Sequence, residues 1–306
     1  MSAGVRSHTD TWGAADCTVR FASAHGVATA LDQVSLAAPR GEVTAVVGGD
    51  GAGKTTLLRM LAGRVIPAPG RVAVPELRRI GFMPSTSGAW RDLTVDENVA
   101  FVGRAYGMSA ARLAARRREL LERADLLDVA DRLGGRLSGG MRQKLGFCLA
   151  MLHEPDLVIL DEPSTGVDPV SRVELWRMIG EAAAAGRAVV MSTTYLDEAE
   201  RAASVLVLDG GHALYSGEPS AIADSVSGVI VRGAQWPKSA GAATWRRGTE
   251  VRAWYATEPP PGAAVESTPD LEDSVIALTL ARATSGGVHA LVGDGGTRAA
   301  SDGPHG

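Results

Sequence analysis

The stretch Gly48-Gly49-Asp50-Gly51-Ala52-Gly53-Lys54-Thr55-Thr56 contains the pattern G-x-x-x-x-G-K-[ST], which is typical of a phosphate-binding loop between a strand and a helix. A short β-branched run, Val43–Val47, precedes it, and Thr55–Ala62 has the periodicity of a helix. Glycines let backbone N–H groups approach phosphate oxygens closely, and the start of the helix adds a positive dipole. We expect this loop to bind a nucleotide, with Lys54 reaching the β- and γ-phosphates and the Thr55 hydroxyl ligating Mg²⁺.

A matching acidic element follows further along the chain, in Asp156-Leu-Val-Ile-Leu-Asp161-Glu162. The apolar run Leu157–Leu160 predicts a buried strand, so that Asp161 emerges at its carboxyl end beside the phosphate loop. Asp161 can then hold Mg²⁺ through water, and Glu162 can polarise an attacking water as general base. A strand that ends in two acids by chance is the alternative, and the phosphate loop upstream weighs against it.

A third element, which we name the signature segment, begins with Leu137, Ser138, Gly139 and Gly140 and continues through Met141, Arg142, Gln143 and Lys144. Ser138 can cap a helix that begins near Met141. The two glycines allow backbone N–H groups to approach an anion. In isolation the segment predicts only the start of a helix. Its position shortly before the acidic strand favours a functional role.

In this order, the three elements and Ser164-Thr-Gly-Val-Asp168-Pro169 resemble the nucleotide-binding subunit of an ABC transporter over roughly residues 15–224. The resemblance implies an α/β fold: a P-loop ATPase core with an inserted helical subdomain and an antiparallel β subdomain. It also implies an ATP-sandwich dimer, in which ATP held by Lys54 meets Ser138–Gly140 of the other subunit and Asp168 lies at the dimer seam. For stacking on adenine, it points to His25, with Phe21 as the other candidate.

Finer features resemble one branch of that family, the ATPases of drug-resistance-type exporters. They are Gly166-Val-Asp-Pro169, then Glu174-Leu-Trp176, then Tyr195-Leu-Asp-Glu-Ala-Glu-Arg201. The resemblance implies an ATPase that powers a separate membrane permease through ATP-dependent dimerisation. It further implies a cytoplasmic location, peripheral on the inner face of the cell membrane, with the helical subdomain near Ser85–Asn98 docking the permease.

Two positions depart from the family. Ser85 stands where the family carries a glutamine that contacts Mg²⁺ and the attacking water, and Thr194 stands where it usually carries a histidine that reaches the γ-phosphate. Threonine can donate a hydrogen bond but carries no positive charge. Losing one such preorganised group costs roughly 10²–10³ in rate. We therefore expect slow hydrolysis at this chain's own site and a heterodimer with a complete ATPase subunit; a homodimer in which both residues act through water is the alternative.

Strands and helices alternate from Cys17 to about Asp224, which predicts a mainly parallel sheet covered on both faces. We expect a loose N-terminal arm (1–15), an ATPase domain (16–225) with a helical subdomain at about 85–135, an α+β appendage (226–284) and a disordered tail (285–306). Within the helical subdomain, Thr94 and Glu97 fit a capping box. Within the appendage, Gly228–Arg232 and Glu250–Tyr255 predict strands and Leu271–Ala281 a helix.

The composition argues against several classes of protein. The 306 residues are 45% hydrophobic and 22% charged, with a formal net charge of −4, as in an ordinary globular protein and unlike a general nucleic-acid binder. No apolar run approaches the roughly 20 residues of a membrane-spanning helix, so we expect a soluble chain that does not cross the membrane itself. Two cysteines, Cys17 and Cys148, favour a reducing cytoplasm over a disulfide or zinc framework.

Two other functions stay open. A regulatory subunit that binds nucleotide without useful catalysis is favoured by Ser85 and Thr194 and opposed by the intact Glu162. Non-transport relatives in DNA repair or translation carry long coiled coils or two ATPase domains. This chain has neither a sustained heptad repeat nor a second phosphate loop.

Overall fold

The computed structural model describes residues 11–23, 26–233, 243–266 and 268–285. The chain divides into two compact units, and each is described by itself. The first contains Met1–Val226 and Thr268–Val275, and the second contains Ser227–Ser267 and Ile276–Gly306, within the described ranges.

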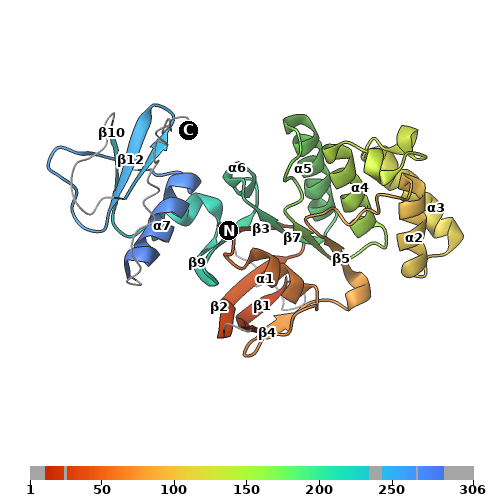
Figure 1. The fold of residues 1–306 in the computed structure, drawn as a ribbon, viewed down its shortest axis with the longest axis horizontal. Helices are drawn as coiled ribbons and strands as arrows, with labels where there is room; N and C mark the ends of the chain where they lie inside the picture. Colours follow the sequence, from red (N-terminus) through yellow and green to blue (C-terminus); the bar gives the residue numbers. More distant parts are fainter. Residues whose placement is uncertain (1–10, 24–25, 234–242, 267, 286–306) are drawn as a thin grey trace, which may run out of the picture. The chain divides into compact units, whose positions relative to one another are not determined.

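A six-stranded sheet forms the centre of the first unit (Figure 1). Its order is β5 (Ile80–Met83), β6 (Leu157–Asp161), β7 (Ala188–Thr193), β3 (Val43–Val47), β8 (Ser204–Asp209) and β9 (His212–Gly217). The first five strands are parallel and β9 is antiparallel. Every residue of β3, β6 and β7 is buried, as the mainly apolar runs Val43–Val47 and Leu157–Leu160 predicted for β3 and β6.

Four helices connect or follow these strands: α1 (Lys54–Leu61), α4 (Gly139–Met151), α5 (Pro169–Ala184) and α6 (Leu196–Ala199). Helix α6 ends at Ala199 because the chain turns at once towards β8, and the N–H of Ala203, just before that strand, donates to the carbonyl of Val43. Three-residue 3₁₀ turns lie at Leu77–Arg79, Leu127–Val129 and Gly134–Arg136, and a longer one at Pro219–Ser225.

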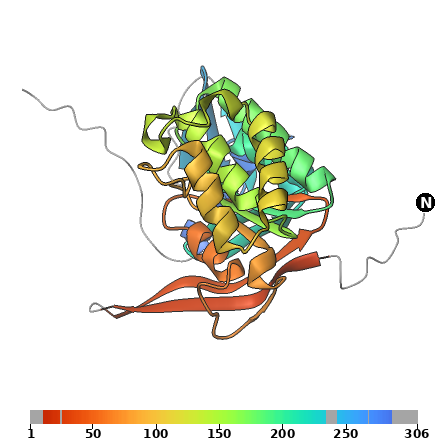
Figure 2. The same cartoon turned by 90° about the vertical axis from the view of Figure 1, so that its right-hand side faces the viewer.

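Between β5 and α4 the chain forms helices α2 (Val95–Ala105) and α3 (Ala110–Arg123), which lie side by side (Figures 1 and 2). The predicted capping box is present: the Thr94 hydroxyl accepts from the Glu97 N–H, and the Glu97 carboxylate accepts from the Thr94 N–H. This hydrogen bonding with Thr94 also lowers the pKa of Glu97. The chain between β5 and α4 contains no strand, as expected for a helical subdomain.

A long hairpin, β1 (Thr11–Ser23) and β2 (Gly26–Pro39), forms a second sheet with β4 (Arg71–Ala73) in the order β2-β1-β4 (Figure 2). The prediction of a loose arm over residues 1–15 is wrong for Thr11–Ala15. Thr11–Ala14 pair with β2 and Gly13–Ala15 pair with β4, so these residues belong to the hydrogen-bonded sheet. Residues 1–10 lie outside the described residues.

The second unit holds a four-stranded antiparallel sheet in the order β11 (Ala243–Arg247), β12 (Glu250–Tyr255), β10 (Val229–Gly233) and β13 (Ala264–Val265). Helix α7 runs from Leu271 to Ser285, so the predicted helix at Leu271–Ala281 continues for four more residues. The tail predicted to be disordered lies outside the described residues except for Ser285. Among the described residues, no helix combines the length and the apolar character that crossing a membrane requires.

Candidate functional site

The phosphate loop, Gly48–Thr56, and the acidic pair, Asp161 and Glu162, meet at the carboxyl edge of the central sheet. Strand β7 lies between β3 and β6, pairing Val47 with Thr193 on one side and Asp161 with Ser192 on the other. The segments that follow all three strands therefore leave the sheet at the same edge. This edge is where open parallel sheets bind ligands.

A cavity of about 210 Å³ lies at this edge, lined by Ala30, Glu162 and the loop from Gly49 to Thr56. The loop needs its glycines. At Gly48, with φ 155°, a Cβ would stand 2.2 Å from the carbonyl oxygen of Leu208, and at Gly53, with φ 106°, it would stand 2.6 Å from that of Ala30. Both close approaches allow the loop to curl over the start of α1.

Lys54 is held at the centre of this loop and is only 6% exposed. Its ammonium donates to the carbonyl oxygens of Gly48 (2.7 Å) and Gly49 (3.1 Å). The same Nζ lies 3.8 Å from Oε1 of Glu162. An ammonium has three donors and no acceptor, so it suits a phosphate oxygen in this position.

Two oxygen-bearing side chains meet beside the loop. The Thr55 hydroxyl donates to Oδ1 of Asp161 at 3.3 Å, and the same carboxylate oxygen accepts from Oγ of Ser192 at 2.8 Å. Mg²⁺ is commonly held by one or two protein oxygens together with phosphate and water, and this pair fits that chemistry. In the described part of the chain, no group of three or more His, Cys, Asp or Glu side chains forms a metal cluster.

Glu162 is one-quarter exposed and faces the cavity. Its Oε2 accepts from the Thr165 hydroxyl at 3.2 Å, and its backbone N–H donates to Oγ of Ser192 at 2.9 Å. Its φ of 49° is in the left-handed region, which non-glycine residues seldom occupy and which often marks functional sites. Ser192 and Thr165 are contacts that sequence reasoning missed; a hydroxyl directly after the apolar run of β7 was the available signal.

The two positions that depart from the family do not line the cavity. Ser85 is exposed in the turn after β5, where the Ser87 N–H donates to the carbonyl of Pro84, and Thr194 is exposed just after β7. Of the two adenine-stacking candidates, His25 lies outside the described residues, and Phe21 is 46% exposed in β1.

The signature segment also lies apart from this chain's own cavity and packs against the start of α5. The Ser138 hydroxyl accepts from the Met141 N–H, so Ser138 caps α4 as predicted. A Cβ on Gly140 would stand 2.4 Å from the Ser171 side chain and 3.3 Å from Oδ2 of Asp168. Asp168 caps α5 through the N–H groups of Ser171 and Val170, and hydrogen bonding from Ser171 is the main cause that lowers the pKa of its carboxylate.

Leu137 and Gln143 of the signature segment are buried, whereas Ser138 and Gly139 lie at its surface. A Cβ on Gly139 would stand 3.0 Å from the carbonyl oxygen of Gly166. Segments far apart in sequence, the starts of α4 and α5, are therefore in close contact.

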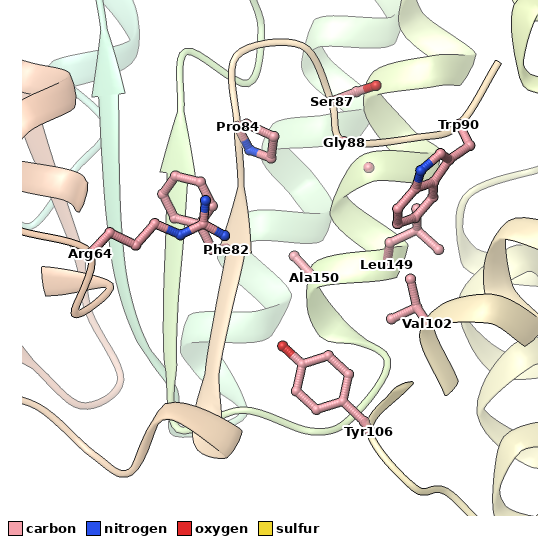
Figure 3. A pocket seen from close by; sticks show the side chains of 11 residues that line it. Arg64, Phe82, Pro84, Ser87, Gly88, Trp90, Val102, Tyr106, Leu149 and Ala150 are labelled. Carbon is pink, nitrogen blue, oxygen red and sulfur yellow. The ribbon is translucent and has the colours of Figure 1, made fainter. Parts of the chain in front are cut away.

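A second pocket, of about 250 Å³, lies between β5, the following turn, α2 and α4 (Figure 3). Its walls are largely apolar and aromatic: Phe82, Pro84, Trp90, Val102, Tyr106, Leu149 and Ala150, with Arg64, Ser87, Gly88 and Gly146. The Arg64 guanidinium lies over the Phe82 ring at 5.0 Å from its centroid, and the Tyr106 hydroxyl points into the pocket. Trp90 is 45% exposed and meets Phe101, which is 47% exposed, edge to face.

The ABC transporter family pattern matches residues 31–165. The probable multidrug ABC transporter ATP-binding protein YbhF of Escherichia coli is 43% identical over 198 residues, which cover 61% of this chain and 34% of YbhF. This chain thus spans about a third of that relative's length.

The Nod factor export ATP-binding protein I of Cupriavidus metallidurans is 37% identical over 218 residues, covering 68% of this chain and 72% of that protein. Among solved structures, an ATP-binding subunit of an ABC transporter superposes with a TM-score of 0.63 at 28% identity, covering 70% of this chain and 92% of that one.

Proposed function

The chain belongs to the ABC transporter family, and on that premise we propose that it binds and hydrolyses ATP to power a membrane exporter. One observation carries the proposal: the cavity at the carboxyl edge of the sheet brings Lys54 and the phosphate loop together with Glu162, beside Thr55 and Asp161. The export direction draws support from the multidrug and Nod factor names of the relatives.

The backbone N–H groups of Gly49–Thr56 bind the phosphates, and Lys54 moves its ammonium from the loop carbonyls to the β- and γ-phosphate oxygens. Mg²⁺, held by Thr55 and through water by Asp161, would neutralise charge on these oxygens. Glu162 accepts the proton of the attacking water as general base. The Thr165 hydroxyl and Lys54 restrict its carboxylate to the cavity side.

The separation of the signature segment from this chain's own cavity supports a dimer in which each signature segment meets the partner's nucleotide. Gly139 and Gly140 would present their N–H groups to the γ-phosphate bound by the other subunit, and Asp168 would lie at the seam. Because α4 and α5 begin in contact, the seam and the signature segment would shift together when ATP binds.

A second candidate is a regulatory subunit that binds ATP but hydrolyses it slowly, paired with a complete ATPase subunit. The positions of Ser85 and Thr194 favour it, since both are exposed and neither lines the cavity. Neither side chain supplies the cation or the long amide that the family carries there, so a bridging water would be needed.

The membrane partner is proposed to dock at the pocket of Figure 3, close to Ser85. An aromatic lining with exposed Trp90 and Phe101 at its border suits an amphipathic helix from a permease. The chain would then work on the cytoplasmic face of the cell membrane, as an ATPase domain with a C-terminal appendage after residue 225.

The test is the steady-state ATPase rate of the purified chain, alone and with the ATPase subunit or permease encoded beside it. A catalytic subunit hydrolyses ATP, loses that rate in Glu162→Gln, and retains ADP with vanadate. The regulatory candidate requires ATP binding without vanadate trapping by this chain. Absence of ATP binding in both arrangements would refute the proposed function.

A further inference from the structure

Glu198, in α6, is a buried carboxylate that the proposed mechanism does not use. Its side chain is 1% exposed. Its Oε2 accepts from two hydroxyls, Oγ of Ser164 at 2.8 Å and Oγ1 of Thr193 at 2.6 Å. A buried charge is costly unless it is hydrogen-bonded, and bonds to a carboxylate are stronger than those between neutral groups. The two hydroxyls are therefore firmly held, although they come from different segments of the chain.

Both hydroxyls lie on segments that adjoin the acidic pair, Asp161 and Glu162. Ser164 follows Glu162 by two residues, and Thr193 follows Ser192 directly. Ser192 in turn donates to Asp161 and accepts from the N–H of Glu162. The carboxylate of Glu198 thus closes a ring of hydrogen bonds that joins the end of β7 to both sides of Glu162.

Glu162 needs such support because its φ is 49°. A non-glycine residue in this region costs roughly 1–3 kcal/mol and persists only where its neighbours fix the backbone. Ser192 fixes the N–H of Glu162, and the Ser164–Glu198 hydrogen bond fixes the chain two residues later. Without the second contact, the chain after Glu162 is held only by the weaker hydrogen bond from the Thr165 N–H to the Glu162 carbonyl, at 3.2 Å.

The other oxygen of Glu198 faces α5. Among the described residues it has no hydrogen-bond partner, and Nε of Arg172 lies 4.0 Å away. Arg172 also pairs with Asp197 at 3.3 Å and lies over the ring of Tyr195. Since α5 begins directly after Asp168, the same carboxylate reaches the helix that starts at the proposed dimer seam.

We propose that Glu198 is a positioning residue for hydrolysis, which sets the orientation of Glu162 through the hydroxyls of Ser164 and Thr193. The proposal rests on the proposed ATPase function. Glu198 lies outside the ATP cavity and touches neither Lys54 nor the phosphate loop, so it should govern the chemical step and not ATP affinity.

The experiment compares Glu198→Ala and Glu198→Gln with Glu200→Ala, an exposed acid two residues further on, in the assembly that gives ATPase activity. Glu198→Ala is expected to lower kcat by about 10- to 100-fold, because a displacement of about 1 Å costs that much, with KM for ATP within about twofold. Glu198→Gln keeps an oxygen that accepts from both hydroxyls, so its kcat should stay within about threefold of the wild type. Glu200→Ala should match the wild type.

Thermal unfolding identifies variants that fail to fold. If Glu198→Ala is one of them, Ser164→Ala and Thr193→Val each remove one of the two hydrogen bonds and are expected to lower kcat by about three- to tenfold. An unchanged kcat in folded Glu198→Ala overturns the proposal. The proposal is also overturned if Glu198→Gln lowers kcat as much as Glu198→Ala does. The same holds if Glu198→Ala raises KM for ATP instead of lowering kcat.

A different result refutes the ATPase function itself: no hydrolysis by the wild-type assembly, or a rate that Glu162→Gln leaves intact. Amide hydrogen exchange over residues 162–168 then decides the positioning role without activity. Faster exchange in Glu198→Ala than in Glu200→Ala supports it, and equal exchange overturns it.

Discussion

His153 makes the stability of the first unit depend on pH. Burial lowers the pKa of its imidazole from 6.5 to about 4, and the positive charges of Arg112 and Arg116 act in the same direction. The ring stacks on Tyr106, with centroids 3.7 Å apart, and Nε2 lies 3.1 Å from the carbonyl oxygen of Ile80. Nδ1 is buried with no hydrogen-bond partner among the described residues, so a proton there would be unsatisfied.

The direction in which stability changes with pH follows from these pKa values. Between pH 6.5 and about 4 the unfolded chain binds a proton at His153 that the folded chain does not, so stability rises with pH in this window. The contribution is complete above pH 6.5 and is lost as the pH falls towards 4. The difference in pKa, at about 1.4 kcal/mol for each tenfold change in proton affinity, sets a ceiling of about 3 kcal/mol. Because the ring is partly exposed, solvent screening reduces this to about 2 kcal/mol.

The test is guanidinium unfolding of the wild type and His153→Gln at about pH 7 and about pH 4.5. Glutamine can donate to the Ile80 carbonyl but does not titrate. The wild type should lose about 2 kcal/mol more than the variant on acidification, since the carboxylates titrate alike in both proteins. Equal losses in the two proteins would refute the reasoning, and a larger loss in the variant would reverse its sign.

Three further predictions concern single residues. Lys54→Ala should weaken ATP binding roughly 30- to 1,000-fold, because a charge-assisted contact to phosphate is lost; a titration with a fluorescent ATP analogue measures it, and a loss below threefold contradicts the assigned role. Gly146→Ala should destabilise the first unit by about 1–3 kcal/mol, since the new Cβ would stand 2.4 Å from the carbonyl oxygen of Ser87; thermal unfolding measures it, and an unchanged midpoint contradicts the packing. Thr94→Ala should cost about 1 kcal/mol by removing the side-chain cap of α2, whereas alanine keeps the backbone N–H that chiefly lowers the pKa of Glu97; thermal unfolding measures the loss, and an unchanged midpoint contradicts the cap.

The parallel core could be predicted because its strands carry a strong local signal. Val43–Val47 is apolar apart from Thr44 and rich in β-branched residues, which is typical of a strand buried on both faces, and its predicted bounds are those of β3. The β1–β2 hairpin carries no such signal. Its pairing is interrupted by register shifts, and Asp16 and Gln33 have positive φ, so alternation of apolar and polar residues is broken along both strands.

The candidate site was predictable where one motif contains all the chemistry, as in Gly48–Thr55. Contacts between motifs were not, because they depend on strand order. Ser192 touches Asp161 only because β7 lies next to β6, and Gly140 touches Ser171 only because α4 and α5 begin together. Whether Ser85 and Thr194 support hydrolysis depends on waters and on a partner that one chain's sequence does not specify.

The contact between Gly140 and Ser171 restricts which sequences this fold can accept. With 2.4 Å between a hypothetical Cβ at position 140 and the Ser171 side chain, the two positions share one small volume. A side chain added at 140 must be matched by a deletion at 171, and a residue larger than serine at 171 would separate the two helix starts. A combinatorial library over both positions should therefore return variants with two small residues, and the tolerated size at one position should fall as that at the other rises.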